Sequence, residues 1–177
     1  MLDDKRIQEA QKNIPIYLQD GLLVKVKIFN RKIQNTYERN FKESLEVATK
    51  LFDEKISNLW VIVCSYYSMF YVANAVLYKL GYKTGTKVAH KVTADALIVY
   101  VRKRLKKSLL EDYEDAKEEA LELIGNKTDD LISSFDKELD KRSFFQYETT
   151  EEVKRAKAKT SLGRAKEFNN EMRKLLL

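Results

Sequence analysis

The stretch SYYSMFYVANAVLYKLGY, residues 65–82, belongs to an uncharged run that extends from residue 56 to residue 78. Apolar side chains recur in this run at intervals of three and four residues, which is the periodicity of an α-helix. One broad apolar stripe, one line of aromatic residues and one line of small residues would then lie on three sides of the helix. The pattern predicts a helix from about residue 57 to residue 80 at the centre of a helical bundle.

The aromatic line consists of Trp60, Cys64, Tyr67, Tyr71, Asn74 and Tyr78. Tyrosine and tryptophan are enriched at interfaces because they bury a large area while their polar atoms still find partners. We expect this side of the helix to face a cleft or a second copy in a symmetric dimer. Coverage by other helices of the same chain and stacking of nucleic-acid bases are the alternatives.

The same uncharged run is long enough to cross a bilayer. Its polar residues and the charged, amphipathic segments on both sides favour a helix buried in a bundle instead, so we expect no membrane partner. The N-terminus is charged from its third residue and has no apolar signal-peptide core. Cys64 is the only cysteine, which is typical of a reducing compartment and predicts a cytoplasmic location.

The whole chain shows helical spacing, with one proline and five glycines among 177 residues. This composition predicts an all-α fold: an up-and-down antiparallel bundle of four long helices with short additional helices, in a single domain. Residues 1–28 are expected to form an N-terminal helical extension, and the core is expected to begin near residue 30. Pro15 is expected to interrupt the first helix.

Glycines and caps mark the expected ends of the later helices. Gly81 is placed to end the central helix, and residues 81–87 have the composition of a loop. Gly125 is expected to end a helix rich in carboxylates. The last two helices are expected at residues 128–147 and 150–176, separated at a Thr149/Glu152 capping box.

The charge balance, 33 Lys+Arg against 27 Asp+Glu, gives a net charge of +6. This excess permits a nucleic-acid partner without requiring one. Five basic side chains within six positions are candidates for phosphate contacts or for favourable charges at a helix C-terminus: Arg102, Lys103, Arg104, Lys106 and Lys107. Residues 153–174 add eight Lys/Arg against two Glu. No zinc-ligand spacing or Gly-rich phosphate loop is present, so we expect no metal and no cofactor.

Three stretches in order, CSYYSMFYVANAVLYKLGY, KVAHKV and LDKRSFFQYETTEEVKRAKAKTSLGRAKEFNNEMRKLL, resemble the HEPN domain superfamily from about residue 40 to the C-terminus. The resemblance implies an all-α bundle that dimerises and binds nucleotides or nucleic acids. Many members of the family are paired with a minimal nucleotidyltransferase. One branch cleaves RNA, as toxins, with an arginine that is followed four to six residues later by a histidine.

In this chain the matching arginine is Arg142, and the position five residues later is Tyr147. A tyrosine, with a reference pKa near 10, is a poor general base at neutral pH. The only histidine, His90, falls at the position of the family's loop histidine. We hypothesise that these three residues converge on one cleft beside Tyr67 and Tyr71.

Structural roles are the alternatives for the same three residues. His90 would be a capping or hydrogen-bonded surface histidine, Arg142 would pair with Glu138, and Tyr147 would pack at the apolar end of the bundle. The sequence as a whole predicts a homodimeric module, weakly catalytic or not catalytic, for nucleotide, RNA or a nucleotidyltransferase-type partner. The first alternative function is a metal-independent RNase toxin, and the second is a structural interaction protein.

Overall fold

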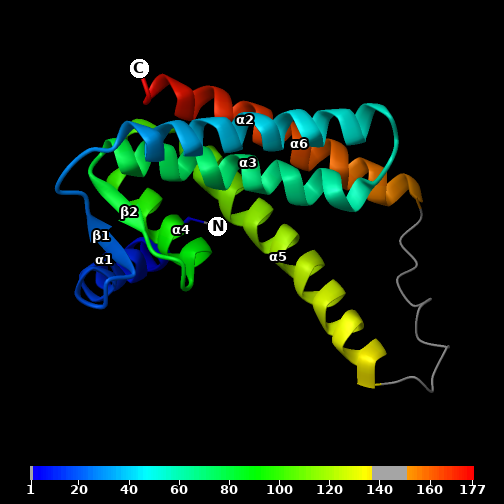
Figure 1. Ribbon diagram of the computed structural model, residues 1–177, viewed down its shortest axis with the longest axis horizontal. Helices are drawn as coiled ribbons and strands as arrows, with labels where there is room; N and C mark the ends of the chain where they lie inside the picture. Colours follow the sequence, from blue (N-terminus) through cyan, green and yellow to red (C-terminus); the bar gives the residue numbers. More distant parts are fainter. Residues whose placement is uncertain (1, 137–150) are drawn as a thin grey trace.

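The computed structural model describes residues 2–136 and 151–177, and these residues are mostly helical (Figure 1). Helix α3 contacts α2, α4, α5, α6 and strand β2. Helices α2 and α6 run along α3, while α5 lies against it with its first turns and then diverges. The elements in chain order are α1 (Asp4–Gln19), β1 (Leu23–Lys25), α2 (Arg31–Asp53), α3 (Asn58–Lys79), β2 (Tyr82–Thr84), α4 (Ala89–Tyr100), the 3₁₀ turn η1 (Arg102–Arg104), α5 (Lys107–Asp136) and α6 (Glu151–Lys174).

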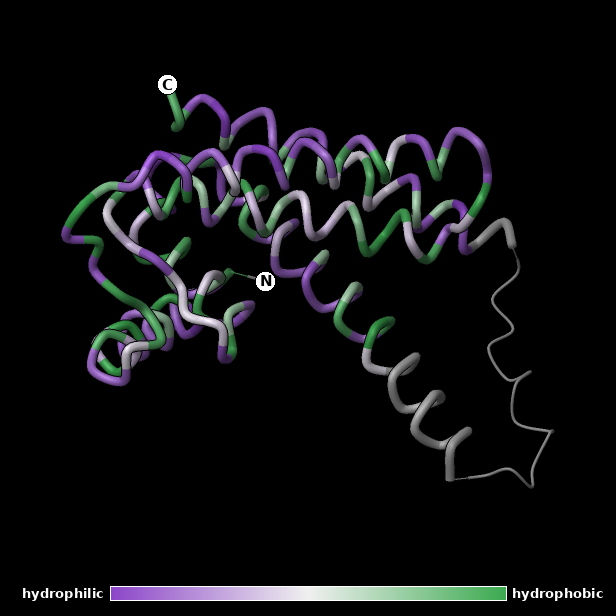
Figure 2. Tube along the Cα trace, in the orientation of Figure 1, coloured by the Kyte–Doolittle hydropathy of each residue, from purple (hydrophilic) through white to green (hydrophobic). Residues whose placement is uncertain are grey.

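Helix α3 is the central helix that the sequence predicts. The Ser57 side chain caps its N-terminus, and Gly81, with φ of +88°, follows its last turn in the left-handed conformation expected of a terminating glycine. Figure 2 shows that α3 carries fewer hydrophilic residues than α2. By length and composition α3 is apolar enough to cross a membrane, and 67% of its most apolar window is buried against the rest of the chain, as in a core helix.

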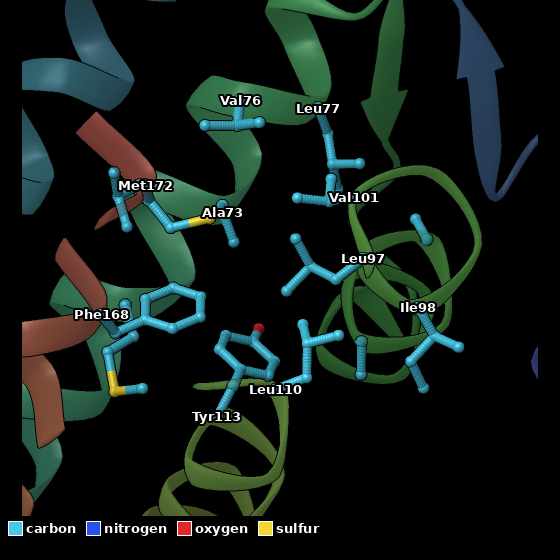
Figure 3. Packing of buried hydrophobic residues seen from close by; sticks show 14 of the residues in the cluster. Ala73, Val76, Leu77, Leu97, Ile98, Val101, Leu110, Tyr113, Phe168 and Met172 are labelled. Atoms are coloured by element: carbon cyan, nitrogen blue, oxygen red, sulfur yellow. The ribbon is translucent and has the colours of Figure 1, made fainter. Parts of the chain in front are cut away.

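The small-residue side of α3 packs against α6. The amide Nδ2 of Asn169 donates to Ser68 Oγ at 2.9 Å, and Ser65 and Ser68 have no exposed surface. On the apolar side, Figure 3 shows residues of α3 meeting Leu97 of α4, Tyr113 of α5 and Phe168 of α6. All three of these side chains are at most 1% exposed. The apolar side and the small-residue side of α3 are therefore both covered by other helices of the same chain.

The expected interruption at Pro15 is wrong, because α1 continues through it from Asp4 to Gln19. Proline inside a helix costs about 3 kcal/mol. Ile14 and Tyr17 on either side of Pro15 are buried, and each fully buried apolar side chain contributes roughly 1.5–3 kcal/mol. Burial of this face against the rest of the chain offsets the lost backbone hydrogen bond.

The expected stop at Gly125 is also wrong, because α5 continues to Asp136. A glycine within a helix costs only about 1 kcal/mol relative to alanine, which the hydrogen bonds of a long helix tolerate. The predicted helix end at residue 147 and the Thr149 cap lie outside the residues that the structure describes.

Strands β1 and β2 form a two-stranded antiparallel ribbon that the sequence analysis missed. Leu23 pairs with Thr84 and Lys25 pairs with Tyr82, so β2 occupies part of the predicted loop. A three-residue strand is too short to show an alternating pattern, and its partner lies nearly 60 residues away in the chain. Only the tertiary contact makes these residues strands.

Candidate functional site

His90 lies in the first turn of α4, where it meets aromatic residues of α3. Its Nδ1 is 2.7 Å from the phenol oxygen of Tyr66. Its ring is 4.6 Å from that of Phe70 and 5.8 Å from that of Tyr67, measured between centroids. The histidine is half-buried in an aromatic environment and is hydrogen-bonded, as in one of the two structural roles considered from the sequence.

The surroundings of His90 keep the imidazole neutral. Burial lowers its pKa from the ordinary value of 6.5, and the positive charge of Lys117 on α5 lowers it further. Burial raises the pKa of Tyr66, so its phenol keeps the proton at neutral pH. Tyr66 can therefore donate to Nδ1 of His90, which leaves the His90 proton on Nε2.

We expect the single imidazole of this chain to titrate below pH 6.5 in proton NMR spectra. Replacement of Lys117 by methionine should raise that pKa, because it removes a neighbouring positive charge. The control is Lys91→Met. Lys91 is an exposed lysine on α4, the helix of His90, and it pairs with Glu9. An unshifted His90 pKa in the Lys117 variant would contradict this description of the site.

The same shift predicts a pH dependence of stability. The folded-state pKa of His90 lies below the unfolded-state value, so the unfolded chain binds the proton first as the pH falls. This contribution to stability is therefore constant above the unfolded pKa near 6.5 and is lost as the pH falls through the folded pKa.

A buried carboxylate, Asp95 on α4, lies at the centre of a polar network with α1. Arg6 Nη2 is 2.6 Å from Asp95 Oδ1. Tyr17 Oη and Asn13 Nδ2 both donate to Asp95 Oδ2, at 2.9 and 2.8 Å. The Asp95 side chain has no exposed surface, so the carboxylate depends on these partners for compensation.

Glu114 on α5 connects this network to Lys117 beside His90. Arg6 Nη2 donates to Glu114 at 2.8 Å, and Lys117 pairs with the other oxygen of Glu114. Two cations and two carboxylates balance each other, so the network offers no excess charge to a ligand. We interpret it as the contact that positions α1, α4 and α5. The sequence signal for this network is one carboxylate, Asp95, inside the otherwise apolar run ADALIVY at residues 94–100, and the sequence analysis did not use it.

A groove of about 620 Å³ lies between α2 and α6, away from His90. Its lining combines four cations and one carboxylate with amide, hydroxyl and apolar side chains: Phe41, Lys42, Leu45, Glu46, Thr49, Lys50, Lys166, Asn169, Asn170 and Arg173. This volume lies in the range of 300–1,000 Å³ that is usual for small-ligand sites. The groove has the size and polarity of a site for an anion with an apolar part.

The charges of the groove are not balanced. Lys50 pairs with Glu46 at 3.2 Å. Within the described part of the chain, Lys42, Lys166 and Arg173 have no carboxylate in ion-pair range. Three cations therefore remain available to phosphate oxygens.

The side chain of Asn169 has a fixed orientation between α6 and α3. Its Nδ2 donates to Ala165 O at 2.8 Å as well as to Ser68 Oγ. Phe41, on the α2 side of the groove, is 3% exposed. Helices α2 and α6 both pack against α3, so the groove between them presents its cations on a packed base.

The five basic residues predicted as phosphate contacts lie between η1 and the first residue of α5, Lys107, and none of them lines the groove. Lys103, Arg104, Lys106 and Lys107 are exposed, and Arg102 is half-buried. Lys107 pairs with Glu111 at 3.8 Å. These residues form a separate basic segment.

The aromatic line of α3 divides into two parts. Trp60 is 55% exposed, and Tyr67 and Tyr71 are half-buried. Asn74 and Tyr78 are 2% exposed. Their polar atoms have partners inside the chain: Thr84 Oγ1 donates to Asn74 Oδ1 at 2.6 Å, and the Asn30 N–H donates to Tyr78 Oη at 3.0 Å. On this line, the surface open to a partner is restricted to Trp60, Tyr67, Tyr71 and the half-buried Cys64.

The remaining predicted site residues, Arg142 and Tyr147, lie outside the described residues, as does Glu138. Their convergence with His90 therefore stays a prediction. In the described ranges, 2–136 and 151–177, no group of three His, Cys, Asp or Glu side chains is arranged to hold a metal ion. Comparisons of the chain with family models, curated proteins and solved structures give no match.

Proposed function

We propose that this chain is a HEPN-type helical bundle that binds RNA through the groove between α2 and α6. The single observation that carries the proposal is a set of groove cations that have no ion-pair partner among the described residues: Lys42, Lys166 and Arg173. Phosphate contacts supply most of the non-specific affinity of proteins for nucleic acids. Leu45, which is half-buried, provides apolar surface beside them for a base or a ribose.

The resemblance to HEPN proteins supports a nucleic-acid ligand over other anions. It also supports a homodimer and a nucleotidyltransferase-type protein partner, and the single cysteine supports a cytoplasmic location; we include all three in the proposal. The half-exposed rings of Trp60, Tyr67 and Tyr71 are the surface on which we place the dimer contact. Light scattering at the protein concentrations of the binding assay reports the number of protomers.

We expect single-stranded RNA to bind with an affinity that falls steeply as salt is raised, measured by fluorescence anisotropy. The double variant Lys166→Glu/Arg173→Glu should weaken binding by about tenfold or more. If both side chains contact phosphates, the slope of log K against log [salt] should fall in magnitude by roughly 1.4, at about 0.7 per contact.

A matched control reverses two exposed cations outside the groove, in the variant Lys12→Glu/Lys159→Glu. It has the same net charge as the groove variant and should retain most of the affinity. An equal loss in both variants would show that binding follows net charge alone and would overturn the groove proposal. A third variant, Lys103→Glu/Arg104→Glu, measures the contribution of the basic segment between α4 and α5.

The same incubations separate binding from cleavage. The RNase alternative predicts that RNA is cut without added metal and that Arg142→Ala abolishes the cleavage. With Nδ1 of His90 accepting from Tyr66, its Nε2–H is the group that can donate to a phosphate oxygen, which is the observation that favours this second candidate. RNA that remains intact with dimeric wild-type protein would exclude it.

A further inference from the structure

The end of the molecule at the β1–β2 ribbon combines exposed apolar side chains with lysines. We call this surface the ribbon patch, and it comprises Val24, Lys25, Lys27, Ile28, Phe29, Lys83, Lys87 and Val88. Ile28 is 84% exposed, and Val24, Phe29 and Val88 are each about half exposed, at 48%, 51% and 59%. They are four of the nine large apolar residues that are exposed among the residues that the structure describes.

Backbone hydrogen bonds join two segments of the ribbon patch, and Lys87 and Val88 follow β2 directly before α4. Val24 lies opposite Lys83 in the ribbon, so both side chains project from the same face. The Val26 N–H donates to Gly81 O, and the Gly85 N–H donates to Leu22 O, each at 2.8 Å. Figure 1 shows the ribbon and the connection to α2 at one end of the molecule.

The charge of the ribbon patch is positive and unopposed. The chain has no Asp or Glu between residues 21 and 37 or between residues 55 and 94. Asp20, exposed at the end of α1, is the nearest carboxylate in sequence. None of Lys25, Lys27, Lys83 and Lys87 forms an ion pair with a described carboxylate.

We infer that the ribbon patch docks this protein on an anionic phospholipid surface. Val24 and Ile28 enter the boundary between headgroups and acyl chains, while the lysines around them face the lipid phosphates. This contact is peripheral and leaves α3 buried in the bundle. It differs from the sequence expectation of no membrane partner, which concerned only a membrane-spanning α3.

Lipid fits this chemistry better than the other occupants. RNA would use the lysines but would leave the branched aliphatic chains exposed, and the one aromatic ring, Phe29, packs against Tyr78 at 5.4 Å. A second copy would place like charges opposite each other. Exposed aliphatic side chains together with exposed lysines are complementary to a lipid surface, whose headgroups are negative and whose interior is apolar.

The test is sedimentation of the full chain with phosphatidylcholine vesicles, with and without phosphatidylserine. We expect binding to the vesicles that contain phosphatidylserine at low salt. Ile28→Glu and Lys27→Glu/Lys83→Glu should each reduce the partition coefficient at least about tenfold. The matched control is Ile56→Glu, because Ile56 is 63% exposed but lies in the turn between α2 and α3.

Several outcomes would overturn the inference. These are equal sedimentation with both kinds of vesicle, no sedimentation with either, or unchanged sedimentation of Ile28→Glu. Loss of RNA binding in the ribbon-patch variants, with no vesicle binding by the wild type, would assign the patch to RNA. The groove variant Lys166→Glu/Arg173→Glu should still bind vesicles, so failure of the RNA proposal is distinguishable from failure of this one.

Discussion

Replacement of Asp95 by alanine is expected to lower the free energy of unfolding by about 3–5 kcal/mol. The substitution leaves Tyr17 and Asn13 without the carboxylate that accepts their hydrogen bonds, and it leaves Arg6 with Glu114 as its remaining partner among the described residues. An unpaired buried charge or donor costs its full desolvation free energy, which exceeds the net value of the original contact. For a domain of this size, the melting temperature should fall by roughly 6–20 °C, as measured by calorimetry or circular dichroism.

The matched control is Asp115→Ala. Asp115 also pairs with an arginine, Arg164, at 3.1 Å, but its side chain is 52% exposed. Because solvent screens such a pair, its loss should cost less than about 1 kcal/mol. Tyr17→Phe removes one hydrogen bond to Asp95 and should lie between the two variants. Similar melting temperatures for the Asp95 and Asp115 variants would contradict the role that we give to the buried network.

Replacement of Phe168 by alanine is expected to cost about 3–5 kcal/mol through the cavity that it leaves. Phe168 has no exposed surface, and its ring is 5.4 Å from that of Tyr113, between centroids. Figure 3 places it with Met172 and Ala73 where α6, α5 and α3 meet. The loss of this ring should therefore weaken three helix contacts at once, and chemical denaturation measures the sum.

The control for cavity formation is Trp60→Ala, which removes an aromatic ring that is 55% exposed. Water already contacts much of that ring, so we expect a loss below about 1 kcal/mol in the monomer. A loss that grows with protein concentration would instead show that Trp60 is buried in a dimer. Equal losses for the Phe168 and Trp60 variants would contradict the observed packing of α6.

The helical elements were largely predictable, and their ends were less so. The α3 stripe has the helical period within itself, and Gly81 ends the helix by its own backbone preference. At Pro15 and Gly125 the local preference opposes a helix, yet both positions lie inside one. The local costs there are about 1–3 kcal/mol, which burial and a long run of backbone hydrogen bonds offset.

The candidate sites were predictable only in part. His90 was identified as the single imidazole, but its neighbours Tyr66 and Lys117 come from two other helices. The basic character of α6 was visible in the sequence. The sequence did not show that Lys166 and Lys42 line the same groove, because α2 and α6 are separated by about 100 residues of chain.

The sequence by itself determined an all-α class and a central helix α3, because helical periodicity is a local property of the chain. Tertiary structure alone decided the pairing of Asp95 with Arg6, the β1–β2 ribbon and the groove between α2 and α6. Each of these joins segments that are far apart in the chain, and no local pattern records which distant residue will be the partner. The physical reason is that such contacts form only when buried surface and compensated charge in the whole fold exceed the entropy lost in bringing the segments together.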